Sequence, residues 1–202
     1  MASKVGICNL ALSHLGVGKD INNLETERSE EAQACRTFYE QALQQTLRDF
    51  EWPFATRFIE LTQVEEDPTS EWGFSYRYPH GCLFFRRILS GIRNDTTDTK
   101  INYRIASDAY GQLIYTDQVD AEAEYTINAD DPNVYPVDFV QALSLRLAYY
   151  IAPRVTKGDP MRLQDKVAAL YLSELTKAQS NAMNEEQSEL LPDAELIRSR
   201  DV

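Results

Sequence analysis

The sequence predicts a mainly helical α+β fold: a four-helix body, an inserted antiparallel β module and an extended C-terminal tail. Two pairs of segments, one near each end of the chain, place apolar residues at helical spacing. Between the pairs, short β-prone runs alternate with turn-forming stretches. The last residues are polar and acidic, so they cannot build a core of their own. The predicted units are 1–53 and 131–183 for the helical body, 54–130 for the β module and 184–202 for the tail.

The first two helices account for most of residues 1–53. The first, at about 4–15, is apolar over a wide arc and is expected to be buried on most sides. The second starts near "TERSEE", where Thr26 or Ser29 can cap the first turn and the glutamates suit the positive end of the helix dipole. It is expected to end at about Asp49, because Pro53 cannot continue a helix.

The β module is expected to consist of short antiparallel strands. The β-prone runs are "TRFIEL", "FSYRY", "CLFFRRIL", "INYRIA", "QLIYT" and "AEYTIN". Turn-forming stretches separate them, namely "EEDPTSE", "RNDTTDTK" and "SDAYG". The second of these stretches is expected to form an exposed hairpin tip.

The last two helices account for residues 131–183. Pro136 suits a first-turn position, and the third helix is expected to stop before Pro153. Asp159 can cap the fourth helix and Pro160 can begin it. The apolar stripe of that helix continues to about Met183.

The tail carries four apolar residues in an acidic segment: Leu190, Leu191, Leu196 and Ile197. Acidic tails are mostly disordered. Leucines in such a tail gain burial only against another surface, so docking on a partner is the alternative to plain disorder.

The composition restricts the class of protein. The chain has 202 residues, enough for one full core, and a formal net charge of −12. Such a charge opposes tight DNA binding through a basic groove, although it does not exclude DNA that passes by. Cys8, Cys35 and Cys82 are scattered in apolar surroundings, which favours buried free thiols and a reducing compartment. The sequence has no clear signal-peptide pattern and no stretch of membrane-spanning length, so we expect a soluble protein made in the cytosol.

The sequence favours a protein without catalytic, cofactor-binding or metal-binding residues. It has two histidines, His14 on an apolar helix and His80 in a turn, and neither has cysteine or histidine neighbours at zinc-ligand spacing. The motifs of nucleotide-binding loops and of hydrolase nucleophiles are absent. Carboxylates are plentiful, so an acid/base pair like that of glycosidases stays open as an alternative.

Two small groups of residues are candidates for structural or interface roles. Phe50, Trp52 and Phe54 crowd around the proline at the end of the second helix, either as a hinge between helix and β module or as an interface anchor. Arg86 and Arg87 lie in a β-prone run, where alternation places them on opposite faces. They can protect an edge strand, form local ion pairs or contact an acidic neighbouring subunit.

Several stretches together resemble the phage head-to-tail adaptor family, the tail tubular protein A-like connectors of short-tailed phages. "ICNLALSHLG" (7–16) and "AQACRTFYEQALQQTLRDFEWPFA" (32–55) resemble the N-terminal half of these proteins. "YRYPHGCLFFRRIL" looks like the family's Tyr-Pro-x-x-Cys-Leu turn and strand, and "EYTINADDPNVYPVDFVQALSLRLAYYIA" like its later block. The resemblance covers most of residues 5–180.

The resemblance implies that the protein is made in the host cytoplasm. Its subunits, typically twelve, then form a ring at the head-tail junction of a virion. In such rings the helices surround the lumen and the C-terminal tail engages the portal protein, here through the four apolar tail residues. The β module faces outward or down, towards the tail nozzle protein. Double-stranded DNA passes through the lumen without sequence-specific binding, and no membrane and no cofactor is involved. An acidic pore lining fits this role, because basic rings would bind the phosphates.

Two alternatives remain open from the sequence. A head-completion connector of a long-tailed phage would form a similar ring with a different lower partner. A carboxylate-based hydrolase of cell-wall glycan is a different class of protein, and it would bury charged residues in a cleft.

Overall fold

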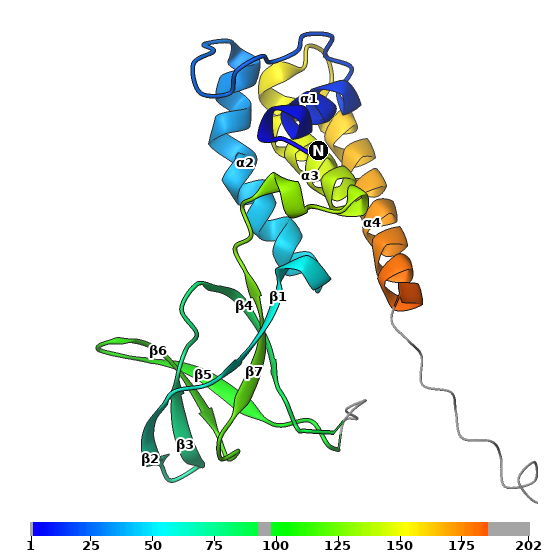
Figure 1. Cartoon of the computed structure of the whole chain (residues 1–202). Coiled ribbons are helices and arrows are strands. Elements are labelled where there is room, and N and C mark those ends of the chain that lie inside the picture. Colours follow the sequence, from blue (N-terminus) through cyan, green and yellow to red (C-terminus); the bar gives the residue numbers. More distant parts are fainter. Residues whose placement is uncertain (1, 93–97, 186–202) are drawn as a thin grey trace, which may run out of the picture.

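The computed structural model describes residues 2–92 and 98–185, which form a helical body and a β module placed end to end (Figure 1). The helices are α1 (Lys4–His14), α2 (Glu30–Asp49), α3 (Val137–Val155) and α4 (Pro160–Glu185). The chain leaves the body at the end of α2, forms the β module and returns into α3. The predicted α+β fold class is therefore confirmed.

The helical body is built around α3, which packs against each of the other three helices. Leu12 of α1, Leu43 of α2, and Phe139 and Leu147 of α3 are fully buried together in its core. The predicted caps are also seen. Ser29 accepts a hydrogen bond from the Ala32 amide at the start of α2, and Asp159 Oδ1 accepts one from the Arg162 amide at the start of α4.

The β module contains two antiparallel sheets. One has the strand order β1-β7-β4 and the other β2-β3-β6-β5. A second core fills the space between them, with Tyr76, Phe85, Ile88 and Ile114 as its largest members. The strands are β1 (Thr56–Glu60), β2 (Gln63–Thr69), β3 (Trp72–Arg77), β4 (Cys82–Ile88), β5 (Tyr103–Asp108), β6 (Gly111–Thr116) and β7 (Glu122–Ile127).

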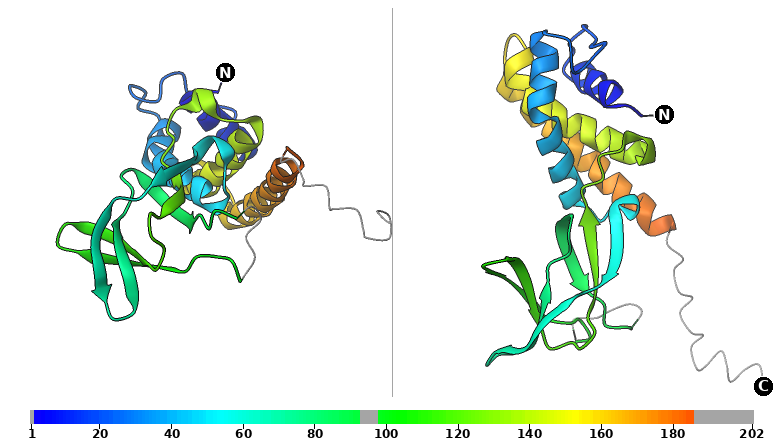
Figure 2. Two further views of the ribbon diagram at one scale, coloured as in Figure 1. Left: turned by 60° about the horizontal axis from the view of Figure 1, so that its bottom comes forward. Right: turned by 60° about the vertical axis from the view of Figure 1, so that its left-hand side comes forward.

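The β module joins the helical body through two paired strands. β1 follows α2 after the 3-10 turn Pro53–Ala55, and β7 leads back towards α3 through the 3-10 turn Pro132–Val134. β1 and β7 are antiparallel neighbours, with Thr56 opposite Thr126. The β module lies beyond the end of α2 in Figure 1 and in the right-hand view of Figure 2. Both covalent connections thus pass through one narrow joint.

The third helix runs through a proline that the sequence predicts to end it. α3 continues past Pro153 to Val155, so the expected stop before Pro153 is wrong. Proline lacks the amide that would donate to the carbonyl four residues earlier, that of Tyr149. Gln164 of α4 supplies the missing donor, with its Nε2 2.9 Å from the Tyr149 oxygen. The helix tolerates Pro153 because a neighbouring helix satisfies this carbonyl.

A strand also occupies a segment where the sequence predicts a turn. Most of "EEDPTSE" belongs to β2, which pairs with β3 through two register shifts. β2 is an edge strand, and an edge position accommodates Pro68 because an outward-facing residue needs no amide for the sheet. Of the predicted hairpin tip "RNDTTDTK", residues 93–97 lie outside the described part of the chain. The turn "SDAYG" connects β5 to β6 as predicted.

Candidate functional site

The three aromatic residues at the end of α2 pack into the helical core beside the joint. Trp52 is 2% exposed, and its Nε1 donates to the Thr46 carbonyl at 2.8 Å. Its ring meets Phe139 of α3 edge-on, with the centroids 4.9 Å apart, and Phe50 at 5.0 Å. Phe54 also packs on Phe139, again at 4.9 Å. These contacts tie the point where the chain leaves the body to the point where it re-enters.

Arg86 connects the β module to the end of α2. Its NH2 group donates to the carbonyls of Leu47, Arg48 and Phe50, at 3.0, 3.3 and 2.8 Å. These carbonyls belong to the last turn and C-cap of α2, which have no amide partners within the helix. The Arg86 Nε donates to Thr126 Oγ1 of β7 at 2.8 Å. One guanidinium therefore caps a helix and binds the returning strand.

The arginines lie on one face of β4, so the expectation that they point to opposite faces is wrong. Arg86 bonds to Thr126, and Arg87 Nε donates to Glu124 Oε2 at 2.5 Å. Thr126 and Glu124 are two residues apart on β7 and share a face. A register shift between Phe85 and Arg87 marks a β-bulge in β4. The extra residue of a bulge breaks the alternation that the sequence pattern assumes.

A pair of carboxyl groups completes the joint. Glu124 is 3% exposed and is ion-paired to Arg87. Glu51 hydrogen-bonds to Glu124, and this bond, together with burial and the repulsion between the two groups, raises the pKa of Glu51 to about 7. Arg86 and Arg87 oppose this rise. The Glu51 carboxyl group, just past the end of α2, therefore holds a proton to higher pH than an ordinary glutamate does.

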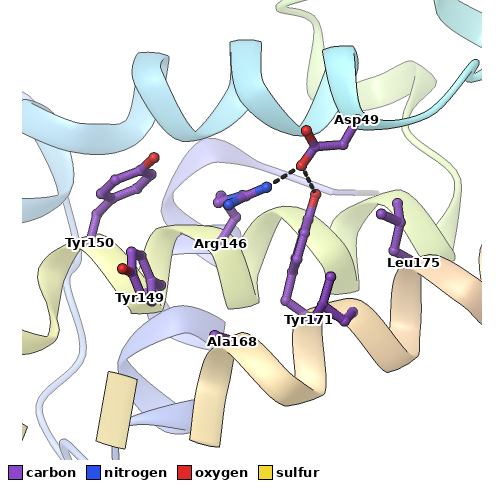
Figure 3. Close-up of a pocket in the computed structure, with 8 residues that line it drawn as sticks. Asp49, Arg146, Tyr149, Tyr150, Ala168, Tyr171 and Leu175 are labelled. Atoms are coloured by element: carbon purple, nitrogen blue, oxygen red, sulfur yellow. Dashed lines mark hydrogen bonds and ion pairs between the residues drawn. The ribbon is translucent and has the colours of Figure 1, made fainter. Parts of the chain in front are cut away.

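A second feature is a groove between α2, α3 and α4, with a volume of about 660 Å³. Figure 3 shows Arg146 of α3 and Tyr171 of α4 directed at the same carboxylate, Asp49 at the end of α2. The Tyr171 hydroxyl donates to Asp49 Oδ2 at 2.7 Å, and the Arg146 guanidinium lies over the Tyr171 ring at 4.1 Å. The groove is lined by Asp49, Arg146, Tyr149, Tyr150, Ala168, Tyr171, Leu172 and Leu175.

The walls of this groove are mainly aromatic and apolar. Tyr150 stacks on Phe38 with the ring centroids 5.8 Å apart, and its hydroxyl donates to Gln45. Leu172 is 62% exposed although it lines the groove. Burial raises the pKa of Tyr171, so this residue stays a hydrogen-bond donor. At the base, Arg146 and Tyr171 both bind Asp49, although the buried Arg146 Nε has no hydrogen-bond partner. The exposed walls are an apolar surface suited to side chains of the same kind.

Sequence reasoning did not find the groove. A signal exists in "LSLRLAYYIA", where Arg146 interrupts an otherwise apolar run and so requires a partner. Its partner, Asp49, is 97 residues away in the sequence, and only the packing of α2 on α3 brings the two together. The tail residues Leu190, Leu191, Leu196 and Ile197 lie outside the described part of the chain.

The other residues considered in the sequence analysis include the three cysteines and His14. Cys8, Cys35 and Cys82 are free thiols, the first two buried and the third half-buried. His14 Nε2 lies 3.2 Å from the Ser144 hydroxyl, between α1 and α3. Across residues 2–92 and 98–185, no cluster of three or more histidine, cysteine or acidic side chains is placed to hold a metal ion. Within the same ranges, no helix is both long and apolar enough to cross a membrane.

Comparisons with protein-family models and with curated proteins find no match to this chain.

Proposed function

We propose that this protein is a structural head-to-tail adaptor of a phage virion, forming a ring beneath the portal protein. The observation that carries the proposal is the joint. A helical body and a β module lie end to end, and Arg86, Trp52 and Phe54 fix the angle between them. A subunit that transmits a fixed geometry from one partner to another needs such a joint. In the ring, the body faces the portal and the β module faces the tail nozzle protein.

The charge of the chain supports this role. With a net charge of −12 on each subunit, a ring repels the phosphates of double-stranded DNA that passes through its lumen. Weak attraction would slow the transit of DNA, because each phosphate contact has to be broken in turn. The DNA is therefore a passing cargo and not a bound partner.

The exposed apolar residues also support assembly. Phe58 on β1 is 59% exposed and Val137 at the start of α3 is 77% exposed. They belong to different units of the subunit, the β module and the helical body. A ring closes through head-to-tail contacts only if each subunit has two different complementary faces. These residues are candidates for such faces, and a ring of twelve would bury them.

The portal-docking role is assigned to the tail, and deletion tests it. A chain that lacks residues 184–202 is expected to fold like the full chain, because the core residues of both units lie before residue 184. It is expected to lose attachment to portal complexes in a co-sedimentation assay. Unchanged attachment of the shortened chain, shown to be folded by circular dichroism, would contradict the docking role. A head-completion connector of a long-tailed phage would behave in the same way towards the portal and differ in its lower partner.

The neighbouring carboxyl groups of Glu51 and Glu124 could in principle act as the acid/base pair of a hydrolase. Glu51 and Glu124 resemble an acid/base pair in that one pKa is raised to about 7. Glu124, however, is 3% exposed and ion-paired, so substrate cannot reach it. We infer that the pair is structural. Turnover of cell-wall glycan by the purified protein, lost in Glu51→Gln, would overturn this inference.

A further inference from the structure

We propose that the groove between α2, α3 and α4 holds residues 186–202 of its own chain in the free subunit. Among the residues that line the groove, Leu172 is exposed, and Tyr149 and Tyr150 are half-buried. Exposed apolar surface of this kind marks an interaction site. The tail supplies four apolar side chains of matching chemistry, Leu190, Leu191, Leu196 and Ile197.

The groove lies on the side of α3 away from α1, where α2 and α4 flank it. Ser144 faces α1, because its hydroxyl contacts His14. Arg146, Tyr149 and Tyr150 are two, five and six residues further on, which at 3.6 residues per turn places them on the opposite side of α3. α1 therefore covers one side of the central helix, and the groove opens on the other side, between α2 and α4.

The length of the tail allows it to reach the groove. Leu175 lies ten residues before Glu185, the end of α4, which corresponds to about 15 Å along the helix axis. Leu190 is five residues past that end and Leu196 eleven, so an extended chain carries them about 17 and about 36 Å. Leu190 can return to Leu175, and Leu196 can reach beyond Leu172.

The covalent connection favours this occupant over a second copy of the chain. A tether of this length gives an effective concentration of the order of millimolar, which a free partner does not reach in dilute solution. Weak apolar contacts are then enough for substantial occupancy. A positive charge is also available to the acidic tail, because Arg154, one turn beyond Tyr150 on α3, is exposed.

Self-docking would regulate assembly. The same apolar residues are proposed above to bind the portal, so a subunit whose tail occupies its own groove cannot display them. Portal complexes would compete for the tail and release it. This consequence rests on the proposed function, whereas the docking itself does not, since it concerns the isolated chain.

Photo-crosslinking of the full-length chain tests the proposal. p-Benzoylphenylalanine at position 172 is expected to crosslink within one chain to the tryptic peptide 178–198, which contains both apolar pairs. The matched control is the same residue at position 170. Leu170 is also exposed, at 43%, but does not line the groove, so no crosslink to the tail is expected there. A crosslink between two chains, equal crosslinking from both positions or none to the tail would overturn the proposal.

A second measurement avoids the bulky residue. In hydroxyl-radical footprinting, oxidation of Leu172 and Tyr149 is expected to rise roughly twofold when Leu190, Leu191, Leu196 and Ile197 are all replaced by serine, because a millimolar effective concentration gives about half occupancy for a contact of millimolar affinity. Oxidation of Leu170 is expected to stay the same. Equal oxidation of Leu172 in both chains would contradict self-docking, and it would leave the adaptor role standing, since that role needs only portal binding.

Discussion

Arg86 stabilises the molecule through hydrogen bonds to three carbonyls of α2 and to Thr126. Arg86→Met keeps the aliphatic stem and removes every donor, which leaves helix-end carbonyls unsatisfied where the β module covers them. We expect the free energy of unfolding to fall by about 2–4 kcal/mol. Urea denaturation followed by circular dichroism measures it.

The matched control for Arg86 is Arg104, which lies in the same β module. Arg104 is 3.9 Å from Glu71, and both side chains are mostly exposed. Arg104→Met is expected to change the free energy of unfolding by less than about 0.5 kcal/mol, because exposed ion pairs contribute little. Equal losses for both substitutions would show that Arg86 does not cap α2.

The two tryptophans make a second comparison between residues. The Trp52 indole donates to Thr46 inside the core, so Trp52→Phe is expected to cost about 2 kcal/mol of stability. The Trp72 Nε1 is buried without a hydrogen-bond partner. Trp72→Phe removes an unsatisfied donor and is expected to be neutral or slightly stabilising. Urea denaturation of both variants measures the free energy of unfolding. A larger loss of stability for Trp72→Phe than for Trp52→Phe would contradict these roles of the two indoles.

The joint between α2 and the β module is expected to respond to pH. The folded state raises the pKa of Glu51 from its ordinary value of 4.5 to about 7, so it binds more protons than the unfolded state between these values. The free energy of unfolding therefore falls as pH rises from about 4.5 to about 7. Because the Glu51 side chain is exposed, solvent screening limits the fall to about 1 kcal/mol.

Replacement of the titrating group checks this pH dependence. Glu51→Gln still donates a hydrogen bond to Glu124 and cannot lose a proton. The variant is expected to lack this part of the decline when urea denaturation is repeated across the pH range. A variant with the pH profile of the native chain would show that Glu51 is not the group that titrates.

The elements that the sequence predicts are those determined by local pattern. The four helices and the caps Ser29 and Asp159 follow from apolar spacing and side-chain chemistry close in sequence. The features that the sequence predicts wrongly depend on residues far apart in the chain. Pro153 stays in α3 because Gln164 satisfies the Tyr149 carbonyl, and neither helix alone contains that information.

The same distinction applies to the candidate sites. Local sequence pointed to the aromatic cluster and to the arginines, but the bulge that turns Arg86 towards α2 depends on the pairing of β4 with β7. The groove needs three helices, and the contacts of Asp49 with Arg146 and Tyr171 bring together residues 97 and 122 positions apart. No local pattern encodes contacts at such separations.

At the scale of the whole molecule, the arrangement supports the proposed connector role. Two units with separate cores are joined by the contacts of Arg86 and Trp52, and each has exposed apolar residues of its own. Self-docking of the tail would keep single subunits from assembling before they meet a portal. A ring that forms on a template needs only weak contacts between its subunits, because each bound subunit presents a face to the next.

The measurement that tests the central claim most directly is the mass of the protein by light scattering, alone and then mixed with portal complexes. The account predicts a monomer alone and a stoichiometric ring of subunits on each portal complex. A stable small oligomer whose mass is the same with and without the portal would contradict the adaptor role.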